Sequence, residues 1–170
     1  MTLPRRYRAA APVLTALLLT ATGIASLAAR PAEAQPGAPA GCTGPASAAW
    51  LNVKVDGVRN GTGLIAMTLY EDNSSKFLAK RGSLYVGRVD AKAGTTRTCI
   101  YLPNTGVWAI AIYHDENANR KFDRSGLGLP AEGYGFSNNP STVAGLPAFR
   151  SVRLNVSKAG LTTQVQMKYP

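Results

Sequence analysis

Histidine, cysteine and acidic residues are all scarce in this sequence. Its 170 residues include one histidine, two cysteines and nine acidic residues, against 19 lysines and arginines. A single histidine, with both cysteines expected in a disulfide, cannot supply the nitrogen and sulfur ligands of a typical zinc site. The sequence therefore disfavours transition-metal sites and leaves any metal site to carboxylate and amide oxygens.

Long apolar runs are lacking beyond the N-terminus, where one segment extends from Ala11 to Ala29. Three arginines precede it within the first eight residues, and Ala32-Glu33-Ala34 follow it as a small-x-small cleavage site. These are the three parts of a secretory signal peptide. A retained membrane anchor would need about 20 mostly apolar residues, and threonine, serine and glycine interrupt this run. We predict a signal peptide over residues 1–34, an exported protein that is periplasmic or secreted, and no transmembrane segment after cleavage.

Acidic residues are too few to balance the basic ones, and the formal net charge is +10. Removal of residues 1–34 takes away four arginines and Glu33, which leaves 15 basic and 8 acidic residues and a net charge of +7. A nucleic-acid surface needs clustered basic residues with aromatics between them, whereas most of the basic residues here are scattered singly. We predict no nucleic-acid partner and only a weak attraction to an anionic envelope surface.

The two cysteines, Cys42 and Cys99, form an even count in a chain that is expected to be exported. This indicates a disulfide between them. The chain-entropy model gives the closure of so long a loop a stabilisation of about 4 kcal/mol. The bridge would also tie the segment before Trp50 to the rest of the domain. The alternative is lipid modification of Cys42, but the preceding Pro39-Ala40-Gly41 lacks the aliphatic residue of such a site.

The chain after the signal peptide divides into a short leader and one domain. Residues 35–49 are rich in proline, glycine and alanine without periodicity, which predicts a flexible leader. Residues 50–170 are long enough for a single domain. Apolar and polar residues alternate along most of it, which is the pattern of half-buried strands. The seven predicted strands cover residues 51–56, 64–70, 84–90, 95–102, 107–113, 152–157 and 161–169.

Short strands at regular spacing, joined by turns rich in glycine and asparagine, are typical of an all-β, antiparallel, two-sheet sandwich. Asn60-Gly61 is a hairpin signal between the first two strands. The segment 107–113 is apolar at every position, which indicates a strand in the middle of a sheet. A helical turn or two is expected over residues 76–80, before Gly82. No helix is long enough to build a parallel sheet.

One long polar loop follows the central strand, and it contains two acids, two amides and a lysine at every second position. These residues are Asp115, Asn117, Asn119, Lys121 and Asp123. Calcium-binding loops supply oxygens from positions one, three, five, seven and nine, and position seven uses its backbone carbonyl. The loop departs from the usual pattern at position six, Arg120, and at position twelve, Gly126. The alternative is a self-capped loop, in which the side chains bond their own backbone.

Three residues of the segment 113–139 are candidates for ligand binding: His114, Glu132 and Tyr134. His114 has the parity of the core residues of its strand, so it is expected to face the edge of the core. Tyr134 lies among glycines, where a ring can stack on a ligand. A hydrolase alternative would use His114 with a loop carboxylate or with Ser137, although the elbow around Ser137 lacks its second glycine.

The segment 113–139 and the first strands resemble one known family. The resemblance rests on Tyr113-His114-Asp115-Glu116-Asn117, the spaced Asn119 and Asp123, Gly128-Leu129-Pro130, the run from Glu132 to Asn139, and the turn after Gly57-Val58-Arg59-Asn60. These residues are similar to the bacterial exported "domain of unknown function 2141" family. The resemblance implies a small exported β-sandwich of the transthyretin or prealbumin-like kind, with an immunoglobulin-like arrangement as the alternative, and no established activity. This chain has Ala118 and Arg120 where members often have glycine.

The sequence thus predicts an exported β-sandwich without a catalytic constellation. We interpret it as a non-catalytic binding or envelope-associated module, with a calcium-binding loop at residues 115–123. Two alternatives stay open: the hydrolase, and a purely structural domain with a self-capped loop.

Overall fold

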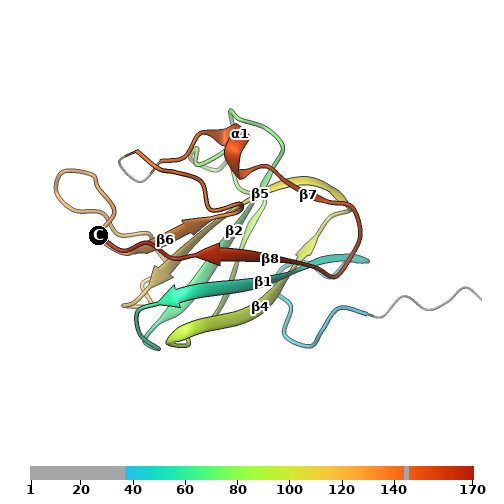
Figure 1. Ribbon diagram of the computed structural model, residues 1–170, viewed down its shortest axis with the longest axis horizontal. Coiled ribbons are helices and arrows are strands. Elements are labelled where there is room, and N and C mark those ends of the chain that lie inside the picture. Colours follow the sequence, from blue (N-terminus) through green and yellow to red (C-terminus); the bar gives the residue numbers. More distant parts are fainter. Residues whose placement is uncertain (1–36, 144–145) are drawn as a thin grey trace, which may run out of the picture. The chain divides into compact units, whose positions relative to one another are not determined.

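The computed structural model describes residues 37–143 and 146–170. The predicted signal peptide, residues 1–34, lies outside the described residues. The described part contains eight strands and one short helix, shown in Figure 1. They are β1 (Ala49–Val58), β2 (Leu64–Glu71), β3 (Tyr85–Asp90), β4 (Gly94–Leu102), β5 (Gly106–Asp115), β6 (Gly133–Phe136), α1 (Phe149–Val152), β7 (Leu154–Val156) and β8 (Leu161–Gln166).

The strands form two sheets that pack face to face (Figure 1). The first sheet has the order β4-β1-β8, and the second has the order β3-β2-β5-β6, with β7 also paired to β5. Apolar side chains at alternate positions of both sheets fill the space between them, among them Val53, Ile65, Ile110 and Val165. The prediction of an all-β two-sheet sandwich is therefore confirmed.

Most connections carry the chain from one sheet to the other. The chain crosses between β1 and β2, between β3 and β4, between β4 and β5, and between β7 and β8. The Asn60-Gly61 turn is therefore not a hairpin, because it joins strands of different sheets. The turn signal identified the reversal but could not identify the sheet to which the next strand belongs.

One strand pair departs from the antiparallel prediction. β1 and β8 run parallel, with Leu51 opposite Leu161 and Val55 opposite Val165. The crossing from β7 into the first sheet lets β8 run in the direction of β1 without a hairpin between them. Alternation of apolar residues is the same in parallel and antiparallel edge strands, so the sequence carried no signal for this direction.

The short strand β6 lies inside the segment that the sequence predicted as one long loop. It pairs with β5 from Ala111 opposite Phe136 to His114 opposite Gly133. Two positions of β6 must be glycine. A Cβ at Gly133 would collide with Tyr169, and a Cβ at Gly135 would collide with Val165. The close approach of β8 and the residues after it thus requires glycines. Because glycine is typical of loops, these residues gave no strand signal in the sequence.

Two helical features differ from expectation or were missed. Residues 74–80 form turns instead of the expected helical turns, with Leu78 at a φ of 55°. The helix of the described region, α1, follows the polar loop and was not expected. No helix in the described residues is long and apolar enough to cross a membrane.

Candidate functional site

Alternate side chains of the central strand β5 point into the core between the sheets and onto the outer face of the second sheet. Trp108, Ile110, Ile112 and His114 point into the core between the sheets, whereas Ala109 and Ala111 belong to a second buried cluster on the outer face. Side chains at odd and even positions of a strand point to opposite faces of its sheet. The predicted parity of His114 with the core residues is confirmed, and it places His114 away from the outer face.

His114 is fully buried and both of its ring nitrogens are hydrogen-bonded. Nε2 lies 2.7 Å from the carbonyl oxygen of Thr62, and Nδ1 lies 2.8 Å from the hydroxyl of Tyr169. A carbonyl can only accept, so Nε2 donates, and in the tautomer with the proton on Nε2 the Nδ1 atom accepts the Tyr169 proton. The Tyr169 hydroxyl in turn accepts the Arg59 N–H at 2.9 Å. His114 therefore fastens the C-terminal residues and the β1–β2 connection to β5.

The polar loop begins with Asp115, which is fully buried. Its Oδ1 accepts the N–H of Asn119 at 3.0 Å, and its Oδ2 accepts the N–H of Arg120 at 2.7 Å. A buried carboxylate needs such donors, because an unpaired charge in a low-dielectric site is costly. Asp115 thus folds the first turn of the loop onto itself.

The amides of the loop continue this arrangement. The Asn117 and Asn119 side-chain oxygens accept the N–H groups two residues further on, those of Asn119 and Lys121. The Nδ2 atoms of both asparagines donate to Oδ2 of Asp123, each at 2.9 Å. The structure therefore brings Asn117, Asn119 and Asp123 together, beside Asp115, and Lys121 is exposed on the outside.

Glu132 closes the loop from its other end. It is 5% exposed, and its two carboxylate oxygens accept the N–H of Glu116 at 3.3 Å and of Asp123 at 3.0 Å. Burial raises the pKa of the Glu132 carboxyl, and the nearby charges of Asp123 and Asp115 raise it further, against the effect of the two N–H donors. Glu132 thus lies within the loop and holds its ends together.

The loop is also fixed to the connection between β1 and β2. The Glu116 carboxylate accepts hydrogen bonds from the Arg59 guanidinium and, at 2.6 Å, from Asn60 Nδ2. These bonds, with Arg59 first, hold the pKa of Glu116 below its usual range. The polar loop is therefore a fixed structure over one end of the sandwich.

The metal-binding capacity of the loop depends on amide oxygens. Among the described residues, no three His, Cys, Asp or Glu side chains are grouped closely enough to hold a metal ion. A cation here would thus need the oxygens of Asn117, Asn119 and the Lys121 backbone in addition to those of Asp115 and Asp123. These are the oxygen ligands that calcium prefers.

Ser137 lies elsewhere and is also fully buried. Its Oγ donates to the carbonyl oxygen of Val152 at 2.5 Å and accepts the N–H of Ile110 at 3.1 Å. Ile110 is four residues before His114 on β5, which corresponds to about 13 Å along a strand. His114 and Ser137 are thus separate, buried and engaged with other partners, and the geometry gives the hydrolase alternative no nucleophile–base pair from these two residues.

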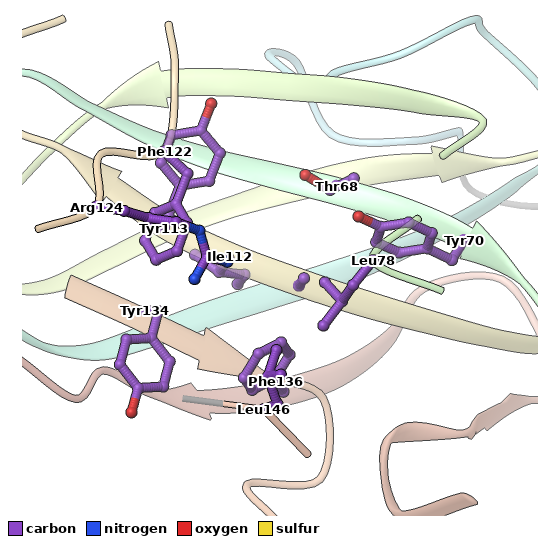
Figure 2. Close-up of a pocket in the computed structure, with 11 residues that line it drawn as sticks. Thr68, Tyr70, Leu78, Ile112, Tyr113, Phe122, Arg124, Tyr134, Phe136 and Leu146 are labelled. Atoms are coloured by element: carbon purple, nitrogen blue, oxygen red, sulfur yellow. The ribbon is translucent and has the colours of Figure 1, made fainter. Parts of the chain in front are cut away.

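A hollow on the outer face of the second sheet was missed by the sequence analysis. Its volume is about 260 Å³, and β2, β5 and β6 form its floor (Figure 2). Aromatic and aliphatic side chains dominate its walls: Tyr70, Leu78, Tyr113, Phe122, Tyr134, Phe136 and Leu146. Thr68 and Arg124 add polar groups. We call this hollow the aromatic pocket. Of the three predicted ligand-binding residues, Tyr134 lines it, whereas His114 and Glu132 are buried outside it.

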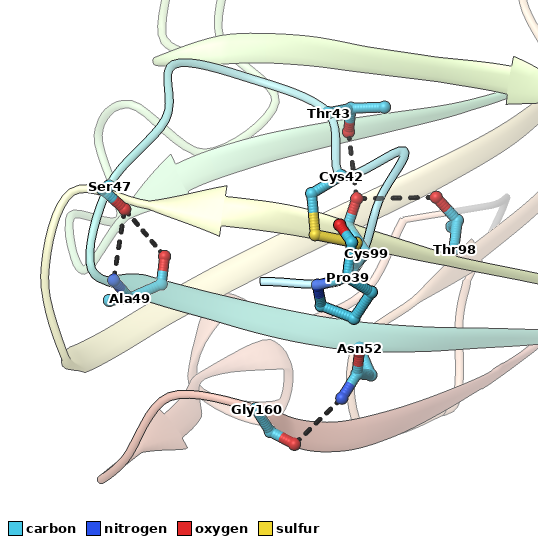
Figure 3. The surroundings of a disulfide bond; sticks show 9 residues. All are labelled: Pro39, Cys42, Thr43, Ser47, Ala49, Asn52, Thr98, Cys99 and Gly160. Atoms are coloured by element: carbon cyan, nitrogen blue, oxygen red, sulfur yellow. Dashed lines mark hydrogen bonds between the residues drawn. A yellow bond between two sulfur atoms is a disulfide. The ribbon is translucent and has the colours of Figure 1, made fainter. Parts of the chain in front are cut away.

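The predicted disulfide joins Cys42 to Cys99 of β4 (Figure 3). Next to it, Thr43 pairs with β4 through two backbone hydrogen bonds, to Cys99 and from Tyr101, at 3.0 and 2.9 Å. Ser47 Oγ bonds the carbonyl oxygens of Ala49 and Leu102. The last residues before β1 are thus fastened beside the free edge of β4.

Comparison with protein-family models gives one match. The model of the family described as "Uncharacterized protein conserved in bacteria (DUF2141)" covers residues 53–164. The chain belongs to this family. The match confirms the resemblance seen in the sequence, and it spans β1 to β8. Comparisons with curated proteins and with solved structures gave no match.

The two positions at which DUF2141 members were expected to have glycine have an unusual backbone in this chain. Ala118 has a φ of 55° and Arg120 has a φ of 63°, in the left-handed region. Only glycine adopts this region without steric cost. The loop therefore keeps its conformation despite two residues that strain it, because the Asp115 carboxylate and the Asn117 side chain bind the backbone N–H groups of Asn119 and Arg120.

Proposed function

We propose that the protein is an exported, non-catalytic binding module whose ligand site is the aromatic pocket. The observation that supports this most directly is the concentration of seven large aromatic and aliphatic side chains around a hollow of about 260 Å³ on a sheet face. Ligand pockets are typically concave, mostly apolar and about 300–1,000 Å³ in volume. The ligand is therefore small, or only part of it enters the pocket.

The surroundings of the pocket support a preformed site. The floor consists of paired strands, and Tyr134 and Phe136 lie with ring centroids 6.0 Å apart on β6. Phe122 packs against Tyr113 with ring centroids 5.6 Å apart, and the self-bonded polar loop carries Phe122. Leu146, 52% exposed, stands at the rim, where an apolar ligand would cover it. A site with fixed walls loses little entropy when a ligand binds.

The test is a titration with the neutral fluorophore N-phenylnaphthylamine. We expect saturable fluorescence enhancement by the wild-type protein and weaker binding by Tyr134→Ala, which removes one wall. The matched control is Tyr101→Ala, on β4 of the other sheet, which should bind as the wild type does. Circular dichroism checks the fold of both variants. Equal binding by the two variants would locate the fluorophore outside the pocket and refute the proposal.

We also propose that the loop at residues 115–123 binds calcium and that the cation fixes one wall of the pocket. The supporting observation is electrostatic. The negative charges of Asp123 and Asp115 reach Glu132 and help to raise its pKa, and none of the three carboxylates forms an ion pair with a basic side chain in the described part of the chain. A divalent cation would neutralise this concentration of negative charge. Phe122 and Arg124, which flank Asp123, line the pocket.

Calcium binding is tested by melting temperature. A ligand that binds only the native state stabilises it by about 2.7 kcal/mol at a concentration 100 times its Kd. We expect Tm to rise with calcium in the wild type and not in Asp123→Asn. Asp90→Asn, which changes an exposed carboxylate at the end of β3, serves as the control with the same loss of charge. A Tm that is independent of calcium, or that responds equally in Asp123→Asn, would favour the purely structural, self-capped loop.

Export is the remaining part of the proposal. The disulfide is compatible with an oxidising compartment. Fractionation of cells, followed by mass spectrometry of the N-terminus, should find a periplasmic or secreted form that begins at residue 35. Weak envelope association would be seen as membrane-fraction protein that salt releases, because exposed charges are screened.

A further inference from the structure

We infer that the aromatic pocket selects a small amphipathic anion, an apolar body with a carboxylate, and that Arg124 binds the anionic group. This inference rests on the proposed binding function and specifies its ligand class.

Arg124 is the only charged residue among the described residues that line the pocket. Figure 2 shows its guanidinium directed over the floor, near Ile112 and Tyr113, and not away from the hollow. Within residues 37–143 and 146–170, no aspartate or glutamate lines the pocket. A ligand inside therefore meets one positive charge without a compensating negative one, which favours an anion and disfavours an ammonium group.

The guanidinium is held in place but retains donors. Its Nη1 donates to the carbonyl oxygen of Gly128 at 2.8 Å, and its carbon atom lies 5.1 Å from the centre of the Phe122 ring. Nη2 and Nε have no hydrogen-bond partner among the described residues. A planar guanidinium that is fixed on one side can offer its other N–H groups to a carboxylate. Arg124 is thus pre-positioned to bind an anion at the edge of an apolar hollow.

The rest of the lining suits an apolar body and a few hydroxyl contacts. Tyr70 and Phe136 are buried, and Phe122, Tyr113 and Tyr134 add further rings to the lining of the hollow (Figure 2). Burial raises the pKa of Tyr70, so its hydroxyl keeps its proton and can donate. The part of the chain that the structure describes gives the lining no amide or carboxylate side chain, so a sugar would find few acceptors for its hydroxyl protons. The chemistry therefore favours an apolar acid over a neutral saccharide.

The experiment compares three probes of the same shape by isothermal titration calorimetry: phenylbutyrate, phenylbutanol and phenylbutylamine. We expect the acid to bind about tenfold more tightly than the alcohol, which is the low end for a charge-assisted hydrogen bond at a partly open site. The amine should bind most weakly. Binding of the acid should also weaken as salt increases, whereas binding of the alcohol should not.

Two variants locate the charge. Arg124→Gln should lower the affinity for the acid to that for the alcohol and leave the alcohol unchanged. Arg97→Gln makes the same charge change at an exposed position of β4, on the other sheet, and should leave all three affinities unchanged. Arg124 is itself exposed, so its replacement should not disturb folding. The comparison of acid and alcohol on the wild-type protein needs no variant.

The outcomes separate the inference from the proposed function. If the alcohol binds in competition with N-phenylnaphthylamine and the acid binds no more tightly, the pocket is a binding site without anion selectivity and the inference is wrong. Unchanged acid binding by Arg124→Gln would refute it in the same way. If none of the three probes gives saturable binding within its solubility, both the inference and the proposed function fail.

Discussion

The His114 network offers a sharp test of the distinction between the core and the binding face. His114→Leu removes a donor to Thr62 and an acceptor for Tyr169 while it keeps an apolar side chain of similar size in the core. Each of these hydrogen bonds contributes about 1 kcal/mol net. Thr62 is an exposed residue at the surface end of this network, so we add no larger desolvation penalty. The expected loss is about 2 kcal/mol in the free energy of unfolding.

A double-mutant cycle isolates the bond between the two rings. Tyr169→Phe removes the hydroxyl that donates to His114 and accepts the Arg59 N–H, so its cost alone should be about 2 kcal/mol. The bond between His114 and Tyr169 is lost in both single variants but can be lost only once. The double variant should therefore be less destabilised than the sum, by about 1 kcal/mol. Independent sites agree with additivity within about 0.3–0.5 kcal/mol, so this coupling is measurable.

The assay is urea denaturation followed by the fluorescence of Trp50 and Trp108, with N-phenylnaphthylamine binding measured under native conditions. His114 points into the core, so the folded variants should bind the fluorophore as the wild type does. Costs that add without coupling would refute the hydrogen-bond geometry. Loss of fluorophore binding by a variant that remains folded would show that His114 communicates with the outer face, contrary to the alternation of β5.

Three further predictions concern other parts of the fold. Replacing Cys42 and Cys99 by serine opens a loop of 57 residues and should cost about 4 kcal/mol in urea denaturation, with no additional loss under reducing conditions. Ala118→Gly and Arg120→Gly relieve left-handed residues and should each raise stability by about 1 kcal/mol, whereas Lys121→Gly, at an ordinary φ, should lower it. Glu116→Gln should lower Tm by a small amount at neutral pH, because the partner Arg59 is half exposed. The pKa of Glu116 is lower in the folded state, so this stabilisation is present above pH about 4.3 and is lost as pH falls through the folded-state pKa; the variant and the wild type should therefore converge in acid.

Local pattern was sufficient to predict most strands but not their partners. Seven of the eight strands have alternating or fully apolar residues, and their predicted positions match the observed ones within a few residues. The eighth, β6, alternates glycines with aromatic residues. Its glycines stand where β8 and Tyr169 leave no room for a side chain. Pairing depends on contacts between distant residues, so the parallel β1–β8 pair had no local signal.

The same limit applies to the candidate site. The spacing predicted a calcium-binding set at Asp115, Asn117, Asn119 and Asp123, and calcium binding stays a prediction. In the structure the Asn117 and Asn119 side chains bond Asp123, whereas the Asp115 carboxylate bonds the loop backbone. The aromatic pocket was missed because its rim comes from three separate segments, which contribute Leu78, Arg124 and Leu146. One signal in the sequence could have indicated that the outer face is covered. Thr68 and Tyr70 of β2 point to the outer face, and a large aromatic side chain stands there at a position where exposure to solvent was expected.

The alternation of β5 connects the fold to the proposed function. Its even positions, from Trp108 to His114, fill the core, so their substitution should change stability first. Its odd positions carry the small Ala109 and Ala111 and then Tyr113, and small side chains on the outer face leave the space in which the aromatic pocket lies. Enlargement of Ala111 to leucine should therefore reduce fluorophore binding while the core packing stays the same. Binding that survives this substitution in a folded protein would mean that the ligand does not reach the floor of the sheet.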